Sequence, residues 1–203
     1  TVKETKKEPV SAEETRFSWK DLNQPFKIFI LASLIFSLGN SSDAFLILRA
    51  KNLGLSLTLT IFAYVLFNVT YALFSEPAGA VADRLGPKKV LITGFVLFAV
   101  VYVLFGLVTS SVYMWILFPL YGIYMGLTDG VGKAYISTMV PKEKLGTAFG
   151  IYYTITGICV LLSSTIAGLL WTYVSVSAPF IYGGVMAIIA TVIFIPNYLS
   201  KKG

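Results

Sequence analysis

The sequence predicts an all-α membrane protein, a single bundle of six membrane-spanning helices. Three observations predict this fold class. Hydrophobic residues make up 56% of the 203 residues and charged residues only 13%, with a mean hydropathy of +0.78. Six apolar runs are each long enough to cross roughly 30 Å of hydrocarbon as a helix. The basic residues also gather in alternate connections between these runs, which is typical of a chain that crosses a membrane repeatedly.

The expected spans are residues 26–48, 57–75, 90–109, 112–140, 145–170 and 178–196. Residues 1–16 alternate Lys and Glu around Pro9 without a hydrophobic period, which predicts a disordered cytoplasmic linker. Residues 17–25 are expected to form a short amphipathic segment at the membrane surface, with Pro25 in the first turn of the first span. Residues 197–203 form a basic cytoplasmic tail. The predicted organisation is therefore one six-span unit with polar ends.

The positions of the basic residues predict the orientation of the chain. In a six-crossing arrangement only Arg49 and Lys51 fall on one side, and Lys133 lies within a span. All other basic residues fall on the opposite side: Lys3, Lys6, Lys7, Arg16, Lys20, Lys27, Arg84, Lys88, Lys89, Lys142, Lys144, Lys201 and Lys202. Loops rich in Lys and Arg remain cytoplasmic. Both termini are therefore expected in the cytoplasm, and the protein is expected in the plasma membrane. The net charge of +6 is not interpreted as a sign of nucleic-acid binding.

The connection expected between the second and third spans carries a distinctive pattern, Gly79-Ala-Val-Ala-Asp-Arg-Leu-Gly-Pro-Lys-Lys89. We interpret it as one short basic loop in which glycine permits a sharp turn. It resembles the G-x-x-x-D-R-x-G-R/K-R/K loop of the major facilitator superfamily of transporters. The matching residues are Gly79, Asp83, Arg84, Gly86, Lys88 and Lys89, whereas Pro87 replaces the usual basic residue. The plainer alternative is a basic turn that only sets orientation.

The resemblance covers about residues 17–196 and implies the C-terminal six-helix half of such a transporter, an inverted 3+3 repeat whose first helices line the substrate cavity. It implies a small-molecule substrate held between this half and an N-terminal six-helix half, in the same polypeptide or a second chain. It also implies coupling to a proton or another cation. The Gly79–Lys89 loop would lock one state of alternating access. No cofactor or metal is expected.

Charged side chains inside a membrane are costly and usually face a cavity or a partner. Asp129 and Lys133 lie four residues apart, on one helix face, and are expected to pair. Alternatively, Lys133 extends to the cytoplasmic surface. Asp43 lies near the outer end of the first span, with Asn40 one turn deeper, and is a candidate proton- or cation-responsive carboxylate. Asp43 acting as a helix cap or as a partner of Arg49 is the alternative.

Tyrosine and asparagine side chains complete the candidate cavity. Tyr64, Asn68 and Tyr71 form a single polar stripe on the second span, because their spacing follows the helical period. They are expected to hydrogen-bond a substrate or, alternatively, a neighbouring helix. Tyr121 and Tyr124 of the fourth span are further cavity candidates.

The composition argues against several other classes of protein. The chain has no histidine, and its single cysteine, Cys159, lies within an apolar run. No nucleophile–base pair or phosphate-binding loop is found, so an enzyme is not expected. Two rivals to the transporter stay open: a six-span channel or homodimeric half-size carrier, and a membrane scaffold or receptor. A related six-span segment upstream would favour the transporter.

Overall fold

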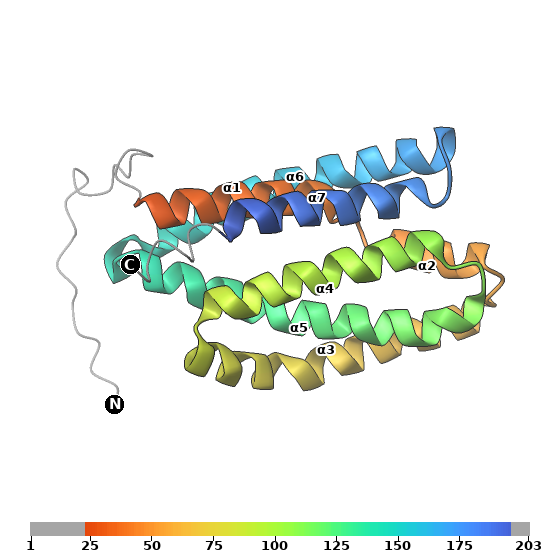
Figure 1. The fold of residues 1–203 in the computed structure, drawn as a ribbon, viewed down its shortest axis with the longest axis horizontal. Helices are drawn as coiled ribbons and strands as arrows, with labels where there is room; N and C mark the ends of the chain where they lie inside the picture. The colour runs from red at the N-terminus through yellow and green to blue at the C-terminus, as the bar shows by residue number, and fades with distance from the viewer. Residues whose placement is uncertain (1–22, 196–203) are drawn as a thin grey trace, which may run out of the picture.

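The computed structural model describes residues 23–195, which form seven α-helices and two single 3-10 turns. The predicted linker 1–16, the tail 197–203 and most of the surface segment 17–25 lie outside these residues. The helices are α1 Gln24–Gly39, α2 Ala44–Asn52, α3 Leu57–Leu85, α4 Pro87–Leu107, α5 Met114–Met139, α6 Leu145–Tyr173 and α7 Ala178–Phe194, and the turns are Ser111–Tyr113 and Lys142–Lys144 (Figure 1). No strand occurs in the described range, and the predicted all-α class is confirmed.

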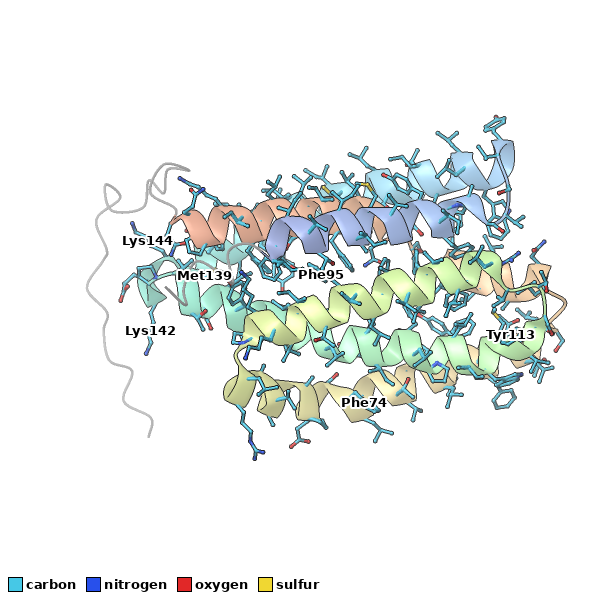
Figure 2. All side chains as sticks on the ribbon, in the orientation of Figure 1. Phe74, Phe95, Tyr113, Met139, Lys142 and Lys144 are labelled. Carbon is cyan, nitrogen blue, oxygen red and sulfur yellow. The ribbon has the colours of Figure 1, made fainter. Side chains whose placement is uncertain are left out.

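Five described stretches are long and apolar enough to cross a membrane: Gln24–Asn52, Leu57–Leu85, Pro87–Leu107, Ser111–Met139 and Lys142–Tyr173. The last helix, Ala178–Phe194, is apolar but shorter. All six run lengthwise through the bundle (Figure 1). Lys142 and Lys144 lie at the end where α1 begins, and Tyr113 lies at the opposite end (Figure 2). The architecture is therefore a bundle of six long antiparallel segments.

The packing order of the helices reads the same from either end. The largest contacts link them in the order α6, α1, α7, α4, α5, α3. If α1 is exchanged with α5, α3 with α6 and α4 with α7, the result is the same order read from its other end. The first three and the last three helices of this order form the two layers seen in Figure 1, α1, α6 and α7 in one and α3, α4 and α5 in the other. This arrangement has the form of an inverted 3+3 repeat.

The first span is not one helix, contrary to the prediction of a continuous segment over 26–48. The helix ends at Gly39 and resumes at Ala44, because Asn40, two serines and Asp43 offer the backbone alternative hydrogen bonds. Interrupted backbone inside a membrane needs partners. The Ser42 amide donates to Ser164 Oγ of α6 over 3.2 Å, and the Ala44 amide donates to Ser42 Oγ. The break is thus supported by neighbouring polar groups.

The predicted Gly79–Lys89 loop is wrong. Residues 79–85 continue α3, Pro87 begins α4, and Gly86 alone connects them, with φ +90°. Helix α3 therefore extends ten residues beyond the predicted end at Ser75. The prediction from hydropathy ended this helix too early, because a helix can continue beyond the membrane, where charged side chains are compatible with it. Proline at the first position of α4 starts the next helix directly, since its missing amide would be unpaired there anyway.

The tightest packing between helices is that of α3 on α5, and glycine makes it so. A Cβ built on Gly122 would approach Phe67 O and Thr70 Oγ1 and would lie 3.0 Å from Tyr71 N. One on Gly126 would lie 3.1 Å from the Phe74 carbonyl carbon. The spacing is the small-xxx-small pattern that lets membrane helices approach closely. The counterpart contact, α1 on α6, is much less extensive, and a cavity opens there.

Candidate functional site

Asp43 lies at the break in the first span and is held by two tyrosines. Tyr121 Oη on α5 donates to Asp43 Oδ1 over 2.9 Å, and Tyr64 Oη on α3 donates to Oδ2 over 3.3 Å. Both oxygens of the carboxylate therefore have a phenol partner, each from a different helix. Both phenols thus supply hydrogen-bond donors to a carboxylate that lies within a membrane-spanning segment.

The two alternative roles weighed for Asp43 are not found. Asp43 occupies the N-cap position of α2, but its side chain makes no capping hydrogen bond. Arg49 is buried, with 5% of its surface exposed, and points to the end of α4 instead. Its guanidinium donates to Phe105 O, Gly106 O and Val108 O at 2.9, 3.3 and 2.8 Å. A cation on the free carbonyls of a helix C-terminus is favourable, so Arg49 fastens α2 to α4.

Asn40 contributes a second contact across the bundle. Its Nδ2 donates to Tyr124 Oη of α5 over 3.2 Å, whereas its Oδ1 is buried and has no partner. The next residue, Ser41, lies 3.4 Å from Tyr102 Oη of α4. Tyr102, Tyr121 and Tyr124 are almost fully buried and pack against Phe98. The polar break is therefore surrounded by an aromatic core that keeps its geometry fixed.

Asp129 forms a second charged cluster toward the opposite end of the bundle. Lys133 Nζ lies 2.9 Å from Asp129 Oδ1, as the four-residue spacing predicted. Tyr71 Oη of α3 donates to Asp129 Oδ2 over 2.7 Å. The side chains of Lys133 and Asp129 are 47% and 43% exposed in this bundle, so the pair lies on an open face.

Helix α3 thus contacts both acids through the predicted polar stripe. Tyr64 binds Asp43 and Tyr71 binds Asp129, seven residues or about 10 Å apart along the helix. Asn68, between them, donates instead to the Tyr64 carbonyl of its own helix and is exposed. Of the two alternatives for the stripe, contact with neighbouring elements is what the structure shows for the tyrosines. Neither lines the cavity directly.

A cavity of about 200 Å³ lies between α1, α5 and α6, with α4 behind it. Aromatic side chains form much of its wall. The polar side chains that line it are Ser33, Ser37, Asn40, Tyr124, Thr128, Asp129, Lys133, Tyr152, Tyr153 and Thr156. Ser33 Oγ is buried and makes no hydrogen bond. A buried polar group without a partner is costly, and two such atoms, Ser33 Oγ and Asn40 Oδ1, border this cavity.

The glycine and acidic pattern of residues 79–89 lies at the basic end of the bundle. Gly79, Asp83 and Gly86 line a groove of about 300 Å³ between α3 and α5. A Cβ on Gly79 would meet nothing within 4 Å, so this glycine serves no close approach inside the described bundle. Asp83, Arg84 and Lys89 are exposed and Lys88 is half-buried. Lys88 Nζ lies 4.9 Å from the ring centre of Phe194, so a cation–π contact joins α4 to α7.

Sequence reasoning missed several residues of the site. Ser33 and Ser37 are such residues; they follow the helical period with the predicted Asn40 and line the cavity with it. The serines gave no signal, because one or two hydroxyls in an apolar helix usually bond to their own backbone. The Gly122-x-x-x-Gly126 spacing is the sequence signal for the close packing of α3 on α5. No group of three or more His, Cys, Asp or Glu side chains that would suit a metal occurs within residues 23–195.

Comparison with known proteins agrees with this geometry. The model of the Major Facilitator Superfamily matches residues 27–202. An uncharacterized MFS-type transporter of Methanocaldococcus jannaschii is 39% identical over 181 residues, which cover 86% of this chain and 45% of the relative. A second such transporter from the same organism is 25% identical over 117 residues, which are 58% of this chain and 30% of that protein. The chain spans less than half the length of these relatives. A six-span bundle with the packing order of an inverted repeat, matched over nearly its whole length, belongs to the Major Facilitator Superfamily.

Proposed function

We propose that this chain is the C-terminal half of a secondary transporter that moves a small solute by alternating access. One observation carries the proposal. A polar cavity opens on one face of an apolar bundle and holds the Asp129–Lys133 ion pair within a membrane-spanning helix. An intramembrane ion pair with side chains nearly half exposed is stable only beside water, solute or a partner. A solute pathway along this face satisfies that requirement.

A second six-helix bundle completes the cavity in this proposal. Only 17% of the most apolar window of α3 and of α6 is buried within the described chain, against 56% for α4. Helices α3 and α6 are the outermost members of the packing order, so their free sides border the open face and the surrounding lipid. The relatives are more than twice as long as the matched segment, which leaves room for such a bundle. Saturable uptake by this chain alone would favour the homodimeric half-size carrier instead.

Coupling to a proton or a cation is proposed for the two tyrosine-bound acids. Asp43 and Asp129 lie on corresponding segments of the repeat and are both joined to α3. Protonation of either carboxylate removes its charge and weakens the phenol bond, because hydrogen bonds to a charged acceptor are the stronger kind. Each acid can thereby link its charge state to the position of α3.

The orientation is proposed from the basic residues, with both termini and the α3–α4 connection in the cytoplasm of the plasma membrane. The test is labelling of single cysteines in the full-length protein lacking other cysteines. Lys88→Cys should react with an impermeant maleimide only after the membrane is opened, and Ser110→Cys should react in intact cells. Reaction of position 88 from outside would contradict this orientation.

Alternating access is tested separately with a cysteine in the cavity. Ser37→Cys lines the cavity on α1, and Tyr113→Cys lies at the exposed outer end as the matched control. A transporter should show reactivity at position 37 from either side of the membrane, in proportions that shift between conditions. Reactivity at position 37 fixed to one side under all conditions would contradict the proposal. Equal simultaneous access from both sides would favour the channel.

A further inference from the structure

We propose that the cavity binds small zwitterions of the α-amino-acid type, with the Asp129–Lys133 pair as the receptor of both charges. This inference rests on the proposed transport function and adds the substrate class. The structural basis is an ion pair within α5 that lines a cavity together with two buried polar atoms that have no hydrogen-bond partner in the described bundle.

Charge balance selects a zwitterion over a simple ion. The pair is neutral as a unit, with Lys133 Nζ 2.9 Å from Asp129 Oδ1. A bound cation would leave the site with one excess positive charge, and a bound anion with one excess negative charge. Uncompensated charge is strongly disfavoured within a membrane protein. A zwitterion inserts its ammonium against Asp129 and its carboxylate against Lys133, so that the site remains neutral and each charge keeps a partner.

Asp129 and Lys133 differ in how firmly their side chains are held when a zwitterion replaces the ion pair between them. Asp129 is held through Oδ2 by Tyr71 at 2.7 Å, which leaves Oδ1 directed to Lys133 and available to an ammonium group. Lys133 is on a flexible four-carbon stem, so its ammonium can swing to the solute carboxylate. The acid is the fixed partner and the base is the movable one.

The unpartnered atoms provide the remaining polar contacts. Ser33 is 96% buried, with 4% of its surface exposed, and Ser33 Oγ has no hydrogen-bond partner. Asn40 Oδ1 is an unused acceptor further along the same cavity wall. A solute ammonium carries three donors, of which Asp129 takes one. Ser33 Oγ and Asn40 Oδ1 are therefore polar groups of the cavity wall that a polar solute can contact.

The test uses full-length protein in lipid nanodiscs and three matched probe sets. Each set contains an amino acid, the amine that lacks its carboxylate and the acid that lacks its amine. The sets are L-alanine, ethylamine and propionate; L-leucine, isopentylamine and 4-methylpentanoate; and L-phenylalanine, 2-phenylethylamine and 3-phenylpropionate. Binding is measured by the shift of the unfolding temperature over a concentration series. We expect at least one amino acid to bind about tenfold or more tightly than both of its analogues.

Neutralising variants should switch this preference in opposite directions. Lys133→Gln should favour the amine of the set, and Asp129→Asn should favour the acid. The double variant Asp129→Lys with Lys133→Asp keeps both charges and should retain the preference for the amino acid. Glu143→Gln, which removes an exposed charge outside the cavity, should leave the order unchanged. The double variant also shows whether lost binding comes from misfolding.

Several results would overturn the inference. They are no stabilisation by any probe, equal binding of an analogue and its amino acid in the wild type, or an unchanged order in both single variants. The accessibility experiment at position 37 uses no solute. If accessibility alternates while the zwitterions fail to bind, the substrate class is wrong and the transport proposal stands.

Discussion

The hydroxyl of Tyr121 donates a 2.9 Å hydrogen bond to Asp43 Oδ1 and so joins α5 to the break between α1 and α2. The phenol is almost fully buried, at 1% exposure. Two helices that correspond in the inverted repeat are therefore joined at the interrupted backbone. This contact makes the Asp43 carboxylate part of the bundle's structure as well as a candidate coupling group.

Removing the Tyr121 hydroxyl should destabilise the protein. Tyr121→Phe leaves one oxygen of the half-buried Asp43 carboxylate without its phenol, and a hydrogen bond to a charged group contributes about 1.5–3 kcal/mol. Thermal unfolding of the purified full-length protein in detergent measures the change. The control is Tyr113→Phe, at a tyrosine that is 50% exposed at the end of the bundle. Equal unfolding temperatures for the two variants would show that the bond to Asp43 contributes nothing to stability.

Arg49 should be required for the position of α2. Arg49→Met removes a buried cation and its hydrogen bonds to three backbone carbonyls at the end of α4, of which Gly106 O keeps a bond from Ser177 Oγ. Each hydrogen bond to a charged group contributes about 1.5–3 kcal/mol, so Arg49→Met should lose more stability than the same substitution of a surface lysine. Limited proteolysis near residues 51–56 should accelerate, together with a lower unfolding temperature. Lys51→Met, on the same helix and exposed, is the control; if it is cleaved as fast as Arg49→Met, the anchoring role is refuted.

The α3–α5 interface should reject even a methyl group. Gly122→Ala places a Cβ against the backbone of α3, including Tyr71 N at 3.0 Å, so the helices must separate. Gly130→Ala lies two turns further along α5, where a Cβ meets nothing within 4 Å. There alanine should be neutral or stabilising by up to about 1 kcal/mol, because it forms helix better than glycine. Unfolding temperatures should therefore move in opposite directions, and a Gly122→Ala protein as stable as wild type would refute the close packing.

The groove beside Asp83 should control a conformational equilibrium. Asp83 lines it and is exposed in the described bundle, and in the proposed transporter it would bind groups of the second bundle. Losing one charge-assisted hydrogen bond of about 1.5–3 kcal/mol in Asp83→Asn would shift a two-state equilibrium roughly 10- to 150-fold. The readout is maleimide reactivity of Ser37→Cys from each side of the membrane.

An orientation-only role predicts a different result for Asp83→Asn, because acidic residues contribute little to topology. Expression and the labelling of position 88 should stay unchanged in either case and so serve as controls. Wild-type accessibility at position 37 in the Asp83→Asn protein would leave this connection as an ordinary basic turn.

The sequence by itself determined the features that depend on local composition. Apolar runs of sufficient length identified the spans, and the pairing of Asp129 with Lys133 followed from helical spacing alone. The pattern from Gly79 to Lys89 identified the family, which the match over residues 27–202 shows. These features require only the period of a helix and the polarity of its side chains.

Only the tertiary structure decided which polar groups meet. Tyr64 and Tyr71 share a stripe on α3, yet their partners Asp43 and Asp129 lie on other elements. Glycine packing at 122 and 126 brings α5, which carries Asp129, close to α3. The break at 40–43 likewise persists because Ser164 of α6 supplies a partner to the freed backbone. Hydrogen bonds act over about 3 Å, so residues far apart in the chain can form them only after helix packing has set their distance.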